Sequence, residues 1–206
     1  MPKVVVAVIA ALALLTAVAP AHASDEMNVV SYARLGEAVV FDGGGRPAPA
    51  FGFGIRGEME TFAVDVSGLN LAIDFHPVDT ARDLLAGSLI KIEVLRFLSP
   101  YTRRSAYVGG GMSWGQLSLG REDALDGSVR SWTGSGLQAE LTAGYEFARK
   151  SPVRFFVQAD ASAPFFMGRH QTFEYSPSGT AVSTTRESRY IPTVVVSAGV
   201  GWHRQR

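Results

Sequence analysis

Apolar residues recur at every second position over several long stretches of this chain, and this alternation constrains the fold more than any other feature. It is clearest in residues 137–147, 153–161 and 194–202, and it returns at 51–55. A period of two is typical of a β-strand, whose successive side chains point to opposite faces. A helical period of 3.6 is hard to find, and glycine accounts for 22 of the 206 residues. The pattern therefore predicts an all-β fold.

The alternation and the turn residues between its stretches predict eight strands. The apolar residues change parity at Ser67-Gly68, where we expect a β-bulge that keeps one continuous apolar face. The predicted strands are residues 28–41, 48–57, 60–75, 87–98, 105–118, 132–148, 152–165 and 189–203.

The first residues have the three parts of a secretory signal peptide. Lys3 supplies a positive charge, residues 4–18 are almost wholly apolar, and Ala21-His22-Ala23 is a small-x-small cleavage site. The apolar run is shorter than the roughly 20 residues that a membrane-spanning helix needs. We therefore expect residues 1–23 to be a cleaved signal peptide and residues 24–206 to form one domain.

Composition excludes several classes of protein. The 19 Lys and Arg residues balance the 19 Asp and Glu residues, so no basic field attracts nucleic acid. Cysteine is absent, which excludes a disulfide scaffold, a cysteine zinc site and a thiol nucleophile. Charged residues are 18% of the chain, below the roughly 25% of an ordinary soluble domain. The chain is expected to hide most of its surface from water.

The two faces of the predicted strands indicate which one points into a barrel. One face is small and weakly charged, as at Gly109, Gly111 and Ser113, which suits the crowded interior of an eight-stranded barrel. The other face is apolar with aromatic residues near its ends, as in membrane barrels, whereas a soluble lipocalin-like barrel has the reverse arrangement. The residues that we expect to face lipid include Phe53, Leu141, Tyr145, Phe155, Val157, Val196 and Trp202.

The lengths of the connections fit this interpretation. Short turns on one side, long loops on the other and an even number of strands are typical of bacterial outer-membrane barrels. The sequence predicts an eight-stranded antiparallel up-and-down transmembrane β-barrel. The short periplasmic turns are expected at 57–60, 99–104 and 149–151, and the longer external connections at 42–47, 76–86, 119–130 and 166–188.

The chain resembles the small eight-stranded outer-membrane β-barrel proteins, the OmpA transmembrane-domain and OmpW-like superfamily. The resemblance covers residues 24–206 and includes the stretches SAYVGGGMSWG at 105–115 and VVVSAGVGW at 194–202. It implies an outer-membrane location and assembly by the barrel-assembly machinery, which recognises a last strand that ends in an aromatic residue. Trp202 takes that place here, followed by residues 203–206.

Charged residues also occur on the faces that are expected to point inward. They could line a polar pore, or they could form a self-satisfied ionic plug. The plug is favoured, because the interior of an eight-stranded barrel is only just wide enough for side chains. These interior residues are Arg56, Glu58, Asp65, Lys91, Glu93, Glu140, Glu146, Arg154 and Asp160.

A turn centred on Lys150 would set the register of the two strands beside it. Glu146 would then face Arg154 as an ion pair, and Glu140 would face Asp160. Two carboxylates in a confined space cannot both ionise easily. A cation from across the barrel, Arg56 or Lys91, is therefore expected beside them; the alternative is a shared proton.

The expected function is that of an integral outer-membrane barrel with a structural, surface-interacting or porin-like role in a Gram-negative envelope. A small lateral or gated path for apolar solutes is compatible with it. We expect a monomer surrounded by outer-membrane lipid, with no cofactor, metal site, enzyme activity or nucleic-acid partner. Two alternatives stay open: a lipid A-modifying enzyme and a soluble periplasmic lipocalin-like carrier.

Histidine chemistry is the main support that an enzyme or a metal site could find. Residues 24–206 contain His76, His170 and His203. Asp74 shares a strand face with His76, but no third ligand accompanies them, and zinc sites need at least three protein ligands. The pattern therefore predicts neither a metal centre nor a catalytic site.

Overall fold

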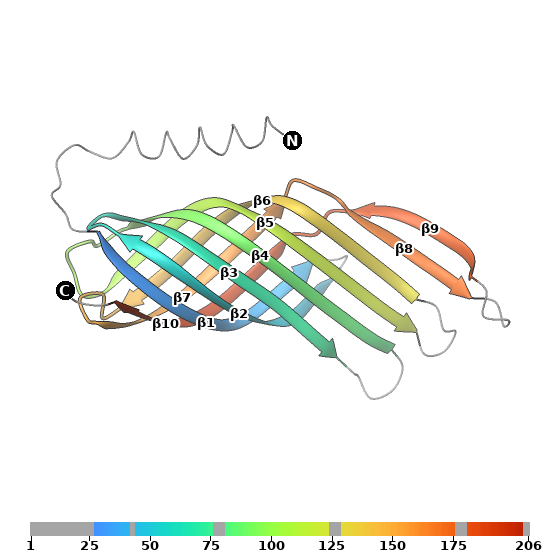
Figure 1. Cartoon of the computed structure of the whole chain (residues 1–206), viewed down its shortest axis with the longest axis horizontal. Coiled ribbons are helices and arrows are strands. Elements are labelled where there is room, and N and C mark those ends of the chain that lie inside the picture. Colours follow the sequence, from blue (N-terminus) through green and yellow to red (C-terminus); the bar gives the residue numbers. More distant parts are fainter. Residues whose placement is uncertain (1–26, 42–43, 76–80, 124–128, 176–180, 204–206) are drawn as a thin grey trace.

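The computed structural model describes residues 27–41, 44–75, 81–123, 129–175 and 181–203 (Figure 1). The expected signal peptide, residues 1–23, lies outside them. Within the described residues, no helix is long and apolar enough to cross a membrane. The strands are β1 (Asn28–Phe41), β2 (Gly45–Glu58), β3 (Phe62–Phe75), β4 (Ala81–Phe97), β5 (Ser105–Asp123), β6 (Val129–Phe147), β7 (Val153–Pro164), β8 (Gly168–Tyr175), β9 (Ala181–Arg189) and β10 (Thr193–His203).

Eight of these strands close into an antiparallel barrel. Strands β1 to β7 pair with their neighbours in chain order, and β10 pairs with both β7 and β1 to complete the ring. The predicted fold class is therefore confirmed. The other two strands form a hairpin, in which β8 pairs with β6 and β9 pairs with β8. This hairpin projects at the end of the barrel opposite to the short turns (Figure 1).

The strands differ from the predicted ones mainly at the external end. The three short turns join β2 to β3, β4 to β5 and β6 to β7, as predicted. Strands β2, β4, β5 and β6 extend into the predicted external connections, and residues 166–188, predicted as one connection, contain β8 and β9. These boundaries were wrong because the apolar alternation fades where the strands leave the apolar zone, while their backbone pairing continues.

The outer face of the barrel carries a belt of exposed apolar side chains. Leu141 is 68% exposed, Phe53 is 63% exposed and Val196 is 60% exposed, although they lie on paired strands. All seven residues expected to face lipid lie on this outer face. Such exposure of large apolar side chains needs a non-aqueous surrounding.

The apolar residues of β3 change from the outer face to the inner face near Gly68. Val64 and Val66 are exposed on the outside, whereas the next apolar residues, Leu69 and Leu71, are buried inside. The register of β3 with β2 and β4 is constant through this point. The bulge expected at Ser67-Gly68 is therefore wrong. The strand stays regular. The apolar residues change from the outer to the inner face because the apolar belt on the outside of the barrel ends at this level.

The same exchange recurs around the barrel. At the level where the interior becomes apolar, the outer face carries polar residues such as Glu37, Asn70, Ser88 and Gln116. The external part of the barrel is thus built like a soluble protein, with an apolar inside and a polar outside. Its core cluster consists of Ala38, Val40, Ala48, Ala50, Leu69, Leu71, Leu85, Leu89, Leu119, Trp132, Ile191 and Val195.

Candidate functional site

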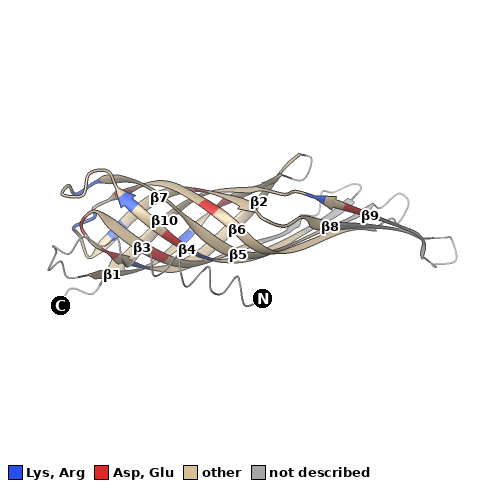
Figure 2. Cartoon of the chain, turned by 90° about the horizontal axis from the view of Figure 1, so that it is seen from above, with Lys and Arg blue, Asp and Glu red and all other residues tan. Residues whose placement is uncertain are grey.

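The interior below this apolar cluster is filled with charged and polar side chains, whose positions on the barrel strands are visible in Figure 2. All nine residues of the predicted interior network are buried here. They are Arg56, Glu58, Asp65, Lys91, Glu93, Glu140, Glu146, Arg154 and Asp160.

Asp160 is the centre of the upper half of this network. Arg34 Nη1 lies 2.6 Å from Asp160 Oδ2, and Lys91 Nζ lies 2.7 Å from Asp160 Oδ1. Thr142 and Gln158 also donate hydrogen bonds to Oδ1, at 2.6 and 2.7 Å. Four donors from β1, β4, β6 and β7 therefore meet on one carboxylate, which cross-links the barrel through its interior.

Arg56 is the centre of the lower half. Its Nε donates to Asp65 Oδ2 at 2.9 Å, and its Nη1 lies 3.4 Å from Glu146 Oε2. Its guanidinium carbon lies 5.5 Å from the centroid of the Tyr32 ring and 5.1 Å from that of Tyr107. These distances are within the range of cation–π contacts. A planar, delocalised cation suits this mixed environment better than an ammonium group does.

Glu140 differs from the other interior carboxylates, because no Lys or Arg of the described residues forms an ion pair with it. Its two oxygens accept hydrogen bonds from Ser113 Oγ at 2.5 Å and from Ser162 Oγ at 2.9 Å. Lys91, one of the two cations expected beside Glu140 and Asp160, does reach Asp160, and it bridges Asp160 and Glu93, whose Oε2 lies 2.8 Å from Lys91 Nζ.

The register between β6 and β7 is shifted by two residues from the predicted one. Thr142 faces Asp160, and Glu140 faces Ser162. The predicted pairing of Glu140 with Asp160 is therefore wrong. The shift is even, so every side chain keeps its predicted face.

The connection between β6 and β7 is asymmetric. Ala148 has a positive φ of 55°, and Ser151 N donates to Ala148 O at 2.8 Å, which closes a turn over 148–151. The pairing of the two strands is centred on Ser151, one residue later than Lys150. Glu146 consequently does not face Arg154, but the two side chains still meet, with Glu146 Oε1 3.2 Å from Arg154 Nη1.

Arg34 is an important residue of the network that the sequence did not indicate. It lies on β1, whose apolar alternation is weak, so its face could not be assigned from the sequence. Tyr32, two residues away on the same face, donates to Asp65 Oδ1 at 2.7 Å. The inward position of both residues follows from the pairing of β1 with β10, which only the structure shows.

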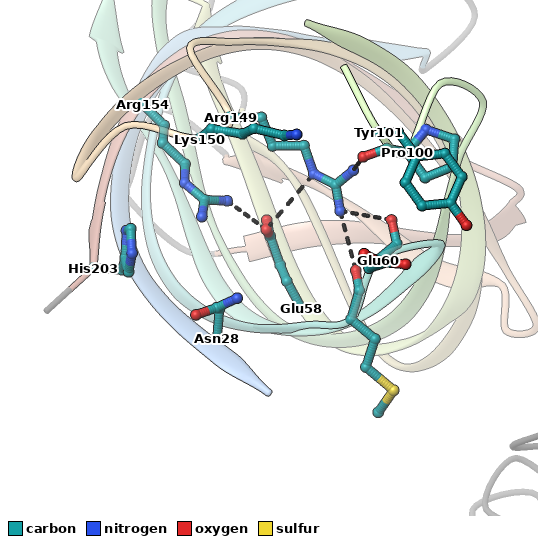
Figure 3. A pocket seen from close by; sticks show the side chains of 10 residues that line it. Asn28, Glu58, Glu60, Pro100, Tyr101, Arg149, Lys150, Arg154 and His203 are labelled. Atoms are coloured by element: carbon teal, nitrogen blue, oxygen red, sulfur yellow. Dashed lines mark hydrogen bonds and ion pairs between the residues drawn. The ribbon is translucent and has the colours of Figure 1, made fainter. Parts of the chain in front are cut away.

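The end of the barrel with the short turns holds an open pocket of about 380 Å³ (Figure 3). Arg149, from the β6–β7 turn, donates to the carbonyl oxygens of Met59, Glu60 and Pro100 at 3.0, 2.9 and 2.8 Å. Its guanidinium carbon lies 3.6 Å from the centroid of the Phe97 ring. Burial lowers the pKa of Arg149, yet arginine stays protonated in proteins. Arg149 thus ties the three short turns together.

Figure 3 also shows how the network reaches this pocket. Arg154 and Glu58 point toward one another and form an ion pair, and Arg149 Nε lies 3.8 Å from the same Glu58 oxygen. His203 lies at the rim of the pocket. Within the residues that the structure describes, no group of three or more His, Asp or Glu side chains could hold a metal ion. His76 lies outside the described residues, and His170 lies on β8.

Comparison with known proteins identifies the fold. No family model matches the chain, and no curated protein matches it. Several solved structures do match. Among them is Neisserial surface protein A, with a TM-score of 0.58 and 11% identity over 85% of this chain and 97% of that one. A major outer membrane protein of Thermus thermophilus has a TM-score of 0.59 and 9% identity over 86% of this chain and 98% of that one. Ail, the attachment invasion locus protein of Yersinia pestis, has a TM-score of 0.53 and 13% identity over 87% of this chain and 100% of that one. The chain therefore has the fold of the small outer-membrane β-barrel proteins.

Proposed function

We propose that this protein is an integral outer-membrane β-barrel without an open path along its axis, and that its role is structural or surface-interacting. The observation that carries the proposal is the filled interior. At the end with the short turns, the ionic network reaches the pocket through Glu58 and Arg154, and the small cluster of Ala63, Leu95, Phe97 and Tyr107 lies beside it. The apolar cluster fills the lumen above both. An ion crossing along the axis would have to displace the ionic network and the apolar cluster.

The external end supports the surface-interacting part of the proposal. The β8–β9 hairpin extends beyond the barrel proper. Glu187 and Arg189 on β9 are exposed, with Arg189 Nη2 3.3 Å from Glu187 Oε2. We also propose that outer-membrane lipid surrounds the apolar belt, that the barrel-assembly machinery recognises β10, and that the barrel is monomeric.

A planar-bilayer recording with the purified protein tests the closed axis. We expect no discrete conductance steps in the parent protein. Regular steps that disappear when the protein is omitted would contradict the closed barrel and favour a porin-like role. Cell fractionation tests the location: recovery in the periplasmic fraction without detergent would favour a lipocalin-like carrier instead.

A further inference from the structure

The pocket at the end with the short turns collects side chains from every connection that lies there. Its volume of about 380 Å³ lies within the range of about 300–1,000 Å³ that is typical of ligand pockets. The three short turns line it with Glu60, Tyr101 and Lys150 among others, and the ends of β1 and β10 line it with Asn28 and His203 (Figure 3). The pocket is thus a meeting point of five separate segments of the chain.

Part of this pocket is held in place by contacts within the protein. Arg149 donates to three carbonyl oxygens of the neighbouring turns. Glu58 at the floor forms an ion pair with Arg154 and lies 3.8 Å from Arg149 Nε. These contacts fix the shape of the pocket before a ligand enters, and a preorganised site loses less conformational entropy on binding.

Other polar groups around the pocket have no partner. His203 Nδ1 is buried and has no hydrogen-bond partner in the described part of the structure. The side chains of Asn28 and Lys150 form no hydrogen bond or ion pair with another described residue. An imidazole nitrogen, an amide and an ammonium group can all donate hydrogen bonds. Unused donors from three segments around one pocket indicate a ligand that accepts hydrogen bonds.

The charges of the lining favour an anion with a single charge. Three cations, Arg149, Lys150 and Arg154, and two carboxylates, Glu58 and Glu60, line the pocket, which leaves one positive charge in excess. Lys150 carries that excess, because Arg149 and Arg154 lie beside Glu58. The exposed Glu60 carboxylate repels a doubly charged ion such as phosphate. It can instead accept a hydrogen bond from an N–H group of the ligand.

A peptide that ends in a free carboxylate combines these properties. Its carboxylate carries one negative charge for Lys150, His203 and Asn28, and its backbone supplies an N–H group for Glu60. The ring of Tyr101, which is 67% exposed at the rim, offers an apolar surface to a side chain of the peptide. Capture of a terminal carboxylate is a recurring mode of peptide recognition.

We propose that this pocket binds the C-terminal carboxylate of a peptide, with Lys150, His203 and Asn28 as the donors. The source of the peptide rests on the proposed function, because an outer-membrane barrel has its short turns in the periplasm. Binding itself does not depend on the closed axis, since the ionic network and the apolar cluster lie above the pocket.

Titration of the folded barrel in uncharged detergent micelles tests this site. The probe is N-acetyl-trialanine with a free carboxylate, and the control is the same peptide with a C-terminal amide. We expect the acid to cause saturable shifts in the backbone amide NMR signals of Asn28, Tyr101 and His203, and the amide form to cause none. Equal shifts with both peptides, or no shift with either, would overturn the proposal.

Lys150→Gln and Arg103→Gln form a matched pair of variants. Each removes one positive charge from an exposed side chain of a short turn, but only Lys150 lines the pocket. We expect the dissociation constant of the acid peptide to rise at least about tenfold in K150Q, as for a lost hydrogen bond to a charged group. In R103Q it should stay within about twofold. Equal weakening in both variants would contradict a defined site, since it would show attraction by the whole charged end.

Acetate and inorganic phosphate separate a peptide site from a general anion site. Neither ion has an N–H group for Glu60 or a side chain for Tyr101. We expect both to bind at least about tenfold more weakly than the acid peptide. Binding of either ion as tightly as the peptide would mean an adventitious ion only and would overturn the assignment. The closed axis is tested separately by the bilayer recording, so failure of the peptide site leaves that part of the proposed function unaffected.

Discussion

The lower and upper parts of this barrel are built from the same strands but have opposite faces. In the lower part, Leu141 and Phe53 are exposed outside, while Asp160 and Arg56 are buried inside. In the upper part, Leu69, Leu71 and Trp132 are buried inside, and polar residues cover the outside. The wall passes from one arrangement to the other without a break in the register of β3.

This inversion shows that burial in the wall depends on the surrounding medium as much as on the side chain. Lipid is as apolar as leucine, so an outward Leu gains nothing from moving inside the membrane part. Water surrounds the external part, and there an inward Leu gains about 25 cal/mol per Å² of apolar surface buried. Charged side chains in the lower lumen remain favourable only because they pair with one another.

Breaking the central ion cluster should give the largest effect on stability. Asp160→Asn leaves Arg34 and Lys91 facing a neutral amide in the buried network. We expect a loss of about 3–5 kcal/mol in the free energy of unfolding, because an unpaired buried charge remains. Urea titration of the barrel in lipid vesicles measures it.

Glu140→Gln is the matched control for Asp160→Asn. Glu140 contacts two serine hydroxyls and no cation in the described network, so an amide keeps much of its hydrogen bonding. We expect a change within about 1.5 kcal/mol. Equal losses in the two variants would contradict the assignment of Asp160 as the centre of the network.

The same truncation on the two sides of the inversion should give different results. Leu69→Ala opens a cavity in the upper cluster and should cost about 2–5 kcal/mol. Leu141→Ala removes the same atoms from the outer belt, where lipid fills the space, and should cost less than about 1 kcal/mol. Similar losses would show that Leu69 does not belong to a packed core.

Arginine substitutions locate the edge of the belt. Leu141→Arg should cost roughly 2–4 kcal/mol, because a lipid-facing charge near the bilayer midplane lacks water. Gln116→Arg, above the inversion on the outer face, should stay within about 0.5 kcal/mol, as expected for a surface substitution. A large loss at Gln116 would place the belt higher than the change of polarity indicates.

The smallest expected effect concerns the three short turns, which lie at the lower end of the barrel. Arg149→Lys keeps the positive charge. The lysine ammonium lacks the planar guanidinium with which Arg149 donates to three carbonyl oxygens at once. We expect a loss of about 1 kcal/mol and faster amide hydrogen exchange in the turns at 59–61 and 98–104. Exchange that stays unchanged would mean that the turns are held by their own backbone.

Much of the fold was predictable because alternation reports directly on a wall between two media. Strands with strong alternation, such as β6, β7 and β10, were placed with the correct faces, and the interior charges of β6 and β7 were found with them. The faces of β1 were not predictable, because its apolar alternation is weak, and Arg34 was missed with it. The register of β6 and β7 was missed by two residues, since parity allows any even shift and the connection between the two strands is asymmetric about Lys150.

The sequence by itself determined that the chain is an all-β barrel wall with an apolar outside and a polar inside, because the side chain at every second position meets the same medium. Only the tertiary structure decided where that rule reverses and which charges meet. In the sequence, Leu69 and Leu71 interrupt the alternation, which suggested a bulge. In the structure they lie in a core that forms only when eight strands bring their external ends together. Likewise, Asp160 is stabilised by partners on β1, β4 and β6, whose closeness follows from barrel closure and not from spacing along the chain.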